Sequence, residues 1–248
     1  MKTGKHSPAG ARLAAAAIGL AVAYPICALL FYVLPALPDT LALLRQQTSF
    51  WQAYGNTLLV CAAALLLQFG IGILGGYALA KCTFPGKQLL FWMCVIAMLL
   101  PVQALILPQY LMLDYLQLLD TPLALILTGG FSPFGVLILW YGFDEIPQET
   151  IEAAYCEGAG AGRILFQIAL PMAKPYLAAL LLIALGELWN MLEQPMAFLK
   201  TPVNYPLSVY LAQIPASAAM LRYTECLLAV LPLLLVFGVA FQKAYKES

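Results

Sequence analysis

The side chains best suited to contact a solute lie in the stretch GELWNMLEQP, near the end of an apolar segment long enough to cross a membrane. Glu187 is an acid within that segment, and Trp189 and Asn190 follow it closely. An intramembrane carboxylate is costly and usually faces a polar cavity or a neighbouring helix. An indole beside amides and acids also suits sugars, whose apolar faces stack on rings while their hydroxyls meet polar groups. These three residues are therefore candidates for a substrate pathway, and a structural hydrogen bond of Glu187 to another helix is the alternative.

Helical geometry separates the three candidates. Residues 187 and 190 are three apart and lie within about 60 degrees on a helix, whereas residue 189 lies about 200 degrees from residue 187. We therefore expect Glu187 and Asn190 to face a cavity or a partner helix. Trp189 is expected to serve helix packing or the membrane interface.

No catalytic pattern accompanies these residues. The sequence contains no GxxxxGK[ST] phosphate loop, no HExxH motif and no recognisable Ser-His-Asp set. Its one histidine, His6, lies in a basic N-terminal tail, and none of its six cysteines are paired at the close spacing of a zinc or redox site. We expect no enzymatic activity, no metal site and no cofactor bound by this chain.

A second polar group occupies residues 143–174, between two apolar segments. The run from Gln148 to Glu157 holds good helix formers, and Gly158 can take the left-handed conformation that ends a helix. A second short helix is expected from Gly160 to the prolines of the LPMAKP segment. A polar helical hairpin of this kind is suited to contact a soluble partner.

This loop resembles the EAA signature of ABC-importer permeases, written as EAA, three spacers, G, nine spacers, I, one spacer and LP. The matching positions are Glu152, Ala153, Ala154, Gly158, Ile168, Leu170 and Pro171. Glu157 stands where an acid usually precedes the glycine. In that family the loop is a coupling helix that docks into a groove of a cytoplasmic ATPase. The resemblance implies an ATPase-coupling role for these eight residues.

Further likenesses favour the carbohydrate branch of the family. Trp189 and Asn190, followed by Pro195, are similar to the WN segment in the fifth span of the smaller maltose-type permease. Weaker likenesses are Asn56-Thr57-Leu58, the segment from Tyr77 to Lys81, and Leu107-Pro108. The resemblance implies import of a sugar or oligosaccharide. Alternatives are another solute such as a polyamine, phosphate or amino acid, or an ATP-independent secondary transporter or channel.

Composition indicates an all-α integral membrane protein of one domain. The chain has 248 residues, of which 63% are hydrophobic and 10% charged, and its mean hydropathy is +0.87. Its formal net charge of zero gives no indication of nucleic-acid binding. Six membrane spans are expected, at about 13–34, 57–80, 89–107, 121–142, 175–192 and 224–242. The first is read as a retained span because it leads into LPALPDT and not into a signal cleavage site.

Charge distribution gives the orientation. Of the 12 Lys and Arg residues, only Arg45, Lys200 and Arg222 fall in loops on the side opposite the termini, which leaves nine on the side of the termini. Cytoplasmic loops carry the excess of positive charge. Both termini and the 143–174 loop are therefore expected in the cytoplasm of a bacterial plasma membrane, where an ATPase would be.

The expected fold is that of a type I importer permease, with six helices in the bilayer and a cytoplasmic coupling loop. Gly72 and Gly76 are spaced for close helix packing, and Pro101, Pro133 and Pro232 are expected to kink their spans. The outer loops are too short to form a capture domain. Expected partners are a second, similar permease in a heterodimer, two ATPase subunits that hold ATP and Mg²⁺, and an extracytoplasmic solute-binding protein.

Overall fold

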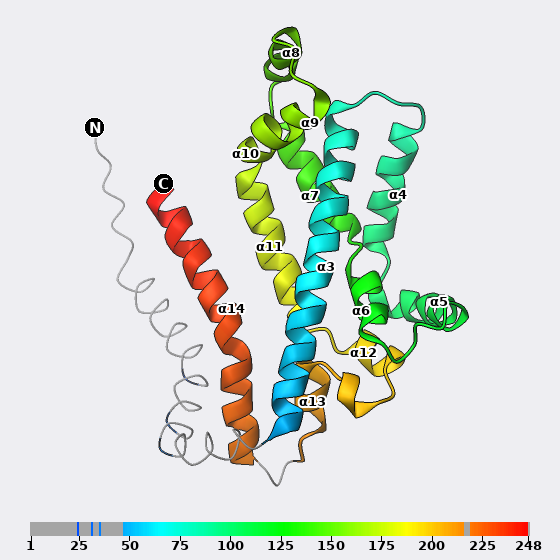
Figure 1. The fold of residues 1–248 in the computed structure, drawn as a ribbon, viewed down its shortest axis with the longest axis vertical. Helices are drawn as coiled ribbons and strands as arrows, with labels where there is room; N and C mark the ends of the chain where they lie inside the picture. Colours follow the sequence, from blue (N-terminus) through cyan, green and yellow to red (C-terminus); the bar gives the residue numbers. More distant parts are fainter. Residues whose placement is uncertain (1–23, 25–30, 32–34, 36–46, 216–218, 248) are drawn as a thin grey trace, which may run out of the picture. The chain divides into compact units, whose positions relative to one another are not determined.

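The computed structural model describes residues 24, 31, 35, 47–215 and 219–247, and most of these residues lie in helices. The predicted first span, 13–34, therefore lies almost entirely outside the described residues. The chain divides into two compact units, residues 1–48 with 214–228 and residues 49–213 with 229–248. All residues that matter for the sites below belong to the second unit. Its helices are shown in Figure 1.

Five helices precede the polar loop in chain order. They are α3 (Thr48–Lys81), α4 (Lys87–Leu99), α5 (Val102–Tyr115), α6 (Pro122–Gly129) and α7 (Pro133–Asp144). The polar loop follows, with α8 (Gln148–Cys156), α9 (Ala161–Ile164), a π-helical turn (Leu165–Ala169) and α10 (Leu170–Met172). The remaining elements are α11 (Lys174–Trp189), α12 (Glu193–Phe198), a 3-10 turn (Pro202–Asn204), α13 (Leu207–Gln213) and α14 (Ala219–Glu247).

Two helical segments are long and apolar enough to cross a membrane, Thr48–Lys81 and Pro122–Asp144. Two bent pairs would raise that number to four: Lys87–Leu99 with Val102–Tyr115, at 107°, and Ala161–Met172 with Lys174–Trp189, at 75°. Tyr223–Val239 is a shorter apolar helical stretch. The count of six spans stays a prediction, because these assignments rest on length and composition within the described residues.

Proline explains where the predicted third span, 89–107, differs from the structure. The helix stops at Leu99, and a new one starts at Val102 in another direction, so the segment is not one straight helix. Pro101 has no N–H to continue the helical ladder and favours an extended conformation at Leu100 (φ −75°, ψ 128°). The predicted kink at Pro101 is confirmed. Pro133 likewise begins α7 after a break at residues 130–132.

Close packing of α3 on α7 depends on the two glycines singled out from the sequence. A Cβ on Gly76 would lie 2.8 Å from the backbone nitrogen of Trp140, and one on Gly72 would lie 3.1 Å from the Leu139 side chain. Such separations leave no room for a methyl group at Gly76. The predicted packing role of Gly72 and Gly76 is confirmed, and α7 also packs against α4 and α11.

Hydrogen bonds organise the end of this unit where α12 and α13 lie. Asp120 has positive φ (59°) and accepts from the backbone N–H groups of Lys200 and Thr201, each at 2.9 Å, and from the Thr201 hydroxyl. These bonds hold the pKa of Asp120 well below its ordinary value. Asn204 adds a bond from its amide nitrogen to the Asp120 carbonyl oxygen, at 2.6 Å. The 117–121 turn is thereby joined to the 199–205 loop.

Helix α3 is bound to the same end by two polar side chains. Asn56 Nδ2 donates to the carbonyl oxygens of Val203, at 2.7 Å, and Tyr205, at 3.1 Å. The buried Thr57 hydroxyl accepts from the N–H of Leu207, at 2.7 Å, and donates to the Ala53 carbonyl. Thr57 thus satisfies a backbone group at the start of α13 that would otherwise be buried without a partner.

Candidate functional site

The polar loop is a helical hairpin whose first helix, α8, ends in a Schellman motif. Gly158 has φ +84°, its N–H bonds the Tyr155 carbonyl oxygen at 2.9 Å, and the N–H of Ala159 bonds that of Ala154 at 3.0 Å. The predicted left-handed glycine is confirmed. A Cβ at Gly158 would meet nothing within 4 Å, so its requirement for glycine comes from backbone conformation and not from crowding.

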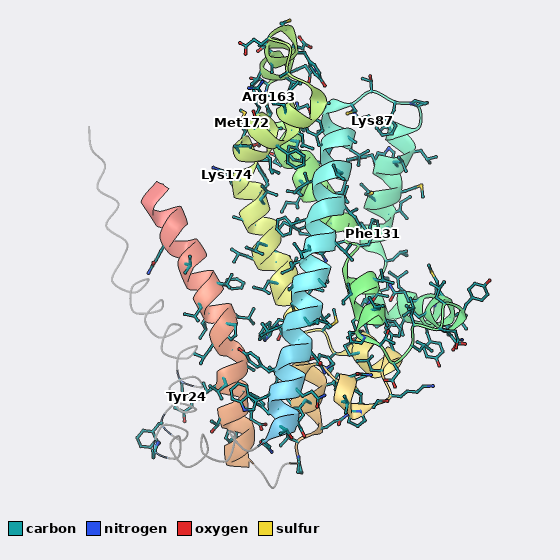
Figure 2. All side chains as sticks on the ribbon, viewed as in Figure 1. Tyr24, Lys87, Phe131, Arg163, Met172 and Lys174 are labelled. Atoms are coloured by element: carbon teal, nitrogen blue, oxygen red, sulfur yellow. The ribbon has the colours of Figure 1, made fainter. Side chains whose placement is uncertain are left out.

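The loop exposes most of its charged and small residues. Glu152, Ala153, Glu157, Gly158 and Pro171 are exposed, whereas Ala154 is buried and Ile168 and Leu170 are half-buried. The hairpin region also exposes apolar and basic side chains. They are Tyr155, Phe166, Met172, Arg163 and Lys174, of which the last three are labelled in Figure 2. Of the predicted coupling residues, the two acids, Ala153, Gly158 and Pro171 therefore face solvent, whereas Ala154, Ile168 and Leu170 face the unit.

Buried apolar residues anchor the hairpin to the helices. Ile151, Ala154, Ile164, Leu165 and Ala169 belong to one core cluster with residues of α3, α7 and α11. Within that cluster Phe143 is 0% exposed and packs edge to face on Tyr77, with ring centroids 5.5 Å apart. Helix α8 is therefore packed against α3, α7 and α11 through buried side chains.

A lysine at the end of α3 also stabilises the segment between α7 and α8. Lys81 Nζ, at the last residue of α3, donates to the carbonyl oxygen of Ile146 at 2.6 Å and of Asp144 at 3.4 Å. A cation near the C-terminal carbonyls of α7 is favourable because it satisfies acceptors and complements the helix dipole. The segment between α7 and α8 is thereby bound to α3.

The second helix of the hairpin ends at Met172, between Pro171 and Pro175, as the sequence predicted. Pro171 lies within the helix, and Pro175 lies in the first turn of α11. The helix widens to a π-turn before Pro171, where the N–H of Leu170 bonds the Leu165 carbonyl oxygen. A wider turn accommodates a proline that has no N–H to give. The bend of 75° between this helix and α11 falls at Ala173.

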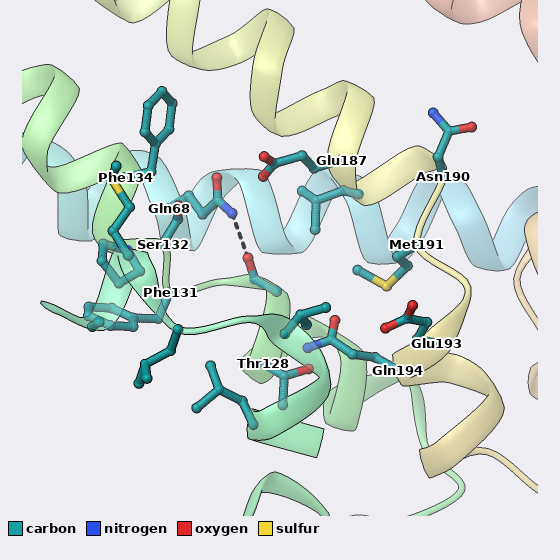
Figure 3. A pocket seen from close by; sticks show the side chains of 18 of the residues that line it. Gln68, Thr128, Phe131, Ser132, Phe134, Glu187, Asn190, Met191, Glu193 and Gln194 are labelled. Atoms are coloured by element: carbon teal, nitrogen blue, oxygen red, sulfur yellow. Dashed lines mark hydrogen bonds between the residues drawn. The ribbon is translucent and has the colours of Figure 1, made fainter. Parts of the chain in front are cut away.

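A cavity of about 700 Å³ lies at the opposite end of α11 (Figure 3). Such a volume falls in the range of small-molecule sites. It is lined by Gln68 in the middle of α3, by the end of α4 and the start of α5, and by residues 128–129, 131–134, 187–188 and 190–194. The lining is mixed, with apolar side chains such as Met98, Leu105 and Phe131 beside acids and amides.

The structure separates the three predicted pathway residues. Glu187 and Asn190 line the cavity and are exposed. Trp189 is 6% exposed, packs edge to face on Tyr54 and donates its indole N–H to the Ala229 carbonyl oxygen at 3.1 Å. The side-chain positions therefore match the helical-face argument, and the roles of these residues in transport stay predictions.

Asn190 contributes less to the cavity than Glu187. Its amide nitrogen donates to the Gly186 carbonyl oxygen at 2.8 Å, and Figure 3 shows its amide directed away from the other labelled residues. This bond satisfies a carbonyl at the C-terminal end of α11. Glu187 has no hydrogen bond or ion pair to any residue in the described part of the chain. The carboxylate is therefore the more available of the two groups.

Gln68 is a cavity residue that the sequence reasoning missed. Its side chain is 5% exposed, and its Nε2 donates to the Gly129 carbonyl oxygen at 2.7 Å, at the break between α6 and α7. The signal for it was present, because Gln68 is the only amide or charged residue within 57–80. Thr128, Ser132, Glu193 and Gln194 complete the polar lining. In the described residues no group of three or more His, Cys, Asp or Glu could hold a metal ion.

A model of a known protein family matches the hairpin and the helices around it. The model of the family described as "Binding-protein-dependent transport system inner membrane component" matches residues 71–243, which is more than half of the chain. That match includes the whole loop, α11 and most of α14. It begins within α3, after Gln68.

Individual relatives match over a smaller share of their own length. The diacetylchitobiose uptake system permease protein NgcG of Streptomyces coelicolor is 32% identical over 200 residues, covering 78% of this chain and 66% of that protein. The arabinooligosaccharides transport system permease protein AraQ of Halalkalibacterium halodurans is 29% identical over 163 residues, covering 66% and 58%. The chain thus spans less than two thirds of the length of these relatives.

A solved structure shares the fold. A bacterial ABC transporter involved in the import of the acidic polysaccharide alginate contains a chain that superimposes with a TM-score of 0.80 at 20% identity. The match covers 97% of this chain and 99% of that one. The fold is therefore that of an ABC importer permease.

Proposed function

Since this chain belongs to the family of binding-protein-dependent transport system inner membrane components, we propose that it is a permease subunit of an ATP-driven importer for a sugar or oligosaccharide. It forms part of a path through the bilayer and carries no chemistry of its own. ATP and Mg²⁺ are held by separate ATPase subunits, and a solute-binding protein delivers the substrate.

The main support for this proposal is the hairpin of residues 148–172, whose first helix has one exposed face and one buried face. Its helix α8 exposes Glu152, Ala153 and Glu157, while Ile151 and Ala154 on the other side are locked into the core. An exposed helix with a packed base is suited to receive movement from a docked protein and to pass it to α7 and α11. This is the arrangement that a coupling helix requires.

The choice of a saccharide is supported by the relatives and by the cavity. NgcG and AraQ are named as permeases for diacetylchitobiose and arabinooligosaccharides. The cavity of about 700 Å³ combines apolar surface with acids and amides, which is the mixture that polyhydroxylated rings bind. It is formed by one chain and lies open, so a second permease subunit, similar to this one, completes the path.

The proposed orientation places the hairpin and both termini in the cytoplasm of a bacterial plasma membrane. Arg163 and Lys174 in the hairpin region and Lys87 at the start of α4 lie at one end of the second unit (Figure 2). Lys81 lies there too, bonded to the Ile146 carbonyl oxygen between α7 and α8. The excess of positive charge marks the cytoplasmic side. The Asp120 cluster then lies on the outer side, where the binding protein delivers its solute.

The test compares two glycines of the hairpin that differ only in backbone conformation. Gly158 has φ +84° and Gly160 has φ −72°, and a Cβ at either would meet nothing within 4 Å. Valine at 158 is strained by on the order of 1 kcal/mol or more, because L-residues avoid the left-handed region. Valine at 160 fits its extended conformation. Gly160→Val is therefore a matched control for Gly158→Val.

The tagged chain would be purified with the proteins that accompany it, and ATP hydrolysis would be measured with and without the co-expressed binding protein. We expect a second permease, an ATPase and ATP hydrolysis stimulated by the binding protein. Gly158→Val should lower both the stimulation and uptake in cells, with Gly160→Val close to wild type at equal abundance. Purification without any ATPase, or equal activity of the two variants, would contradict the proposal.

A further inference from the structure

The charged residues of the cavity have one sign. Glu187 and Glu193 line it, and its lining contains no Lys, Arg or His among the described residues. Both carboxylates are exposed. Charges of one sign in a cleft with low-dielectric walls create a local potential that repels ions of the same sign. The cavity is therefore unfavourable for a carboxylated or phosphorylated solute.

The hydrogen bonds of the carboxamides that line the cavity also disfavour an anionic solute. Each directs its N–H group to an acceptor of the protein: Gln68 to the Gly129 carbonyl oxygen at 2.7 Å, Asn190 to that of Gly186 at 2.8 Å, and Gln194 to Gln109 Oε1 at 3.1 Å. Gln103 Nε2 likewise donates to Glu193 Oε1 at 3.0 Å. Amide donors that would receive an anionic group are thus partly occupied within the protein.

Gln68 supplies an independent sign of a ligand. Its side chain is 5% exposed, it lines the cavity, and its Oε1 has no hydrogen-bond partner among the described residues. The amide orientation is fixed because the Gly129 carbonyl can only accept, so Nε2 must face it. Figure 3 shows the oxygen turned away from Gly129, on the side of the cavity where Glu187 lies. A buried acceptor without a partner calls for a donor from outside the chain.

We propose that the substrate of this permease is a non-anionic saccharide, neutral or amine-bearing, whose hydroxyl and N–H groups donate to Gln68 Oε1 and to the carboxylates of Glu187 and Glu193. This inference rests on the proposed import of saccharides and narrows it. Hydroxyl and ammonium groups satisfy these acceptors, whereas a uronate brings a like charge into the cavity. The transporter of similar fold is described as importing an acidic polysaccharide, so the fold itself does not set this selectivity.

The experiment uses three disaccharides of similar size and the purified complex of the full chain with its co-purifying subunits, without its binding protein. The probes are N,N′-diacetylchitobiose, which is neutral, chitobiose, which is cationic, and an alginate disaccharide, which is anionic. Affinities would be measured by calorimetric titration at low and high salt. Leaving out the binding protein keeps its own specificity from deciding the result.

Two variants assign the effect to the cavity. Glu187→Gln combined with Glu193→Gln removes both charges and keeps shape and an acceptor oxygen at each position. Asp114→Asn removes an exposed carboxylate of α5 that does not line the cavity, and serves as the control. Repulsion between like charges a few ångströms apart predicts that the alginate disaccharide binds wild type at least about tenfold more weakly than the neutral probe at low salt.

The double variant should reduce that difference to within about threefold, and the control should retain it. If the alginate disaccharide binds wild type as tightly as diacetylchitobiose, the charge selectivity is wrong and saccharide import stands. If the wild-type difference persists in the double variant, the two acids are not its cause. The charge selectivity is then wrong and saccharide import stands. If none of the three probes binds, the saccharide pathway and the inference resting on it both fail.

Discussion

Both ends of the second unit pack on buried apolar residues, and at one of them side-chain hydrogen bonds also join the loops. At the hairpin end, α8 and its neighbours join α3, α7 and α11 through a cluster of buried apolar residues with Phe143 at 0% exposure. At the other end, a second buried cluster contains Leu125 and Phe198, each 0% exposed. There the 117–121 turn, the 199–205 loop and the starts of α3 and α13 are also joined by hydrogen bonds that Asp120 and Thr57 accept and Asn56 donates. Apolar packing is thus common to both ends, whereas the hydrogen bonds fix the position of the loops at one of them.

This difference fits the proposed roles of the two ends. The hairpin must bear on a partner and move the helices, so its base is packed and its tip is exposed. The opposite end, where the proposed solute would enter, has short loops that pack on the Phe198 cluster and are also held by hydrogen bonds. Their shape depends on side chains that satisfy backbone groups.

The largest effect is expected from removing the aromatic ring at the packed end. Phe143→Ala leaves a cavity beside Tyr77 and should destabilise the chain by about 3–5 kcal/mol. Phe166→Ala, which truncates a ring that is 59% exposed, should change stability by less than about 0.5 kcal/mol. Thermal unfolding of the purified chain in one detergent would measure both. Equal shifts for the two variants would show that the hairpin is not anchored by this cluster.

A smaller effect is expected at the hydrogen-bonded end. Thr57→Val keeps the shape of the side chain but leaves the N–H of Leu207 buried without its acceptor, which should cost about 1–3 kcal/mol. Thr57→Ser retains the hydroxyl and should cost less than half as much. The same unfolding measurement applies. A Thr57→Ser variant as unstable as Thr57→Val would assign the effect to packing and remove the contrast between the ends.

The smallest effect concerns pH. The pKa of Asp120 is lowered by hydrogen bonds from Thr201 and Lys200. A lowered folded-state pKa stabilises the fold above the ordinary aspartate value, about pH 4, and this contribution is lost as pH falls below it. The unfolding midpoint of wild type should therefore exceed that of Asp120→Asn at pH 7, and the gap should close as pH falls well below 4. A gap independent of pH would show that the charge of Asp120 is not involved.

The sequence predicted features that depend on local backbone rules. Gly158 follows a run of helix formers, the spacing of Gly72 and Gly76 suits close packing, and Pro101 cannot continue a helix, so each could be read without a structure. The hairpin was also recognisable by the spacing of Glu152, Gly158 and Pro171. Such features need only a few neighbouring residues to be specified.

Features that depend on distant contacts could not be predicted in the same way. Gln68 and Gly129 are 61 positions apart, and Asp120 and Thr201 are 81 apart. Nothing near Gln68 in the sequence specifies that a carbonyl at a helix break lies opposite its amide. The π-turn before Pro171 was missed because proline more often ends a helix than widens it.

The most direct test of the central claim, that the hairpin docks a cytoplasmic ATPase, is the accessibility of Cys156. Cys156 is exposed beside Glu157, and Cys82, exposed after α3, is a second site expected on the same side of the membrane. Single-cysteine chains carrying one or the other would be treated with a membrane-impermeant maleimide in intact spheroplasts and in inside-out vesicles. We expect labelling of both sites only in inside-out vesicles, and protection of Cys156 alone, at least about fivefold in rate, when the ATPase subunits are present. Labelling of Cys156 from outside intact spheroplasts, or equal labelling with and without the ATPase, would contradict the account.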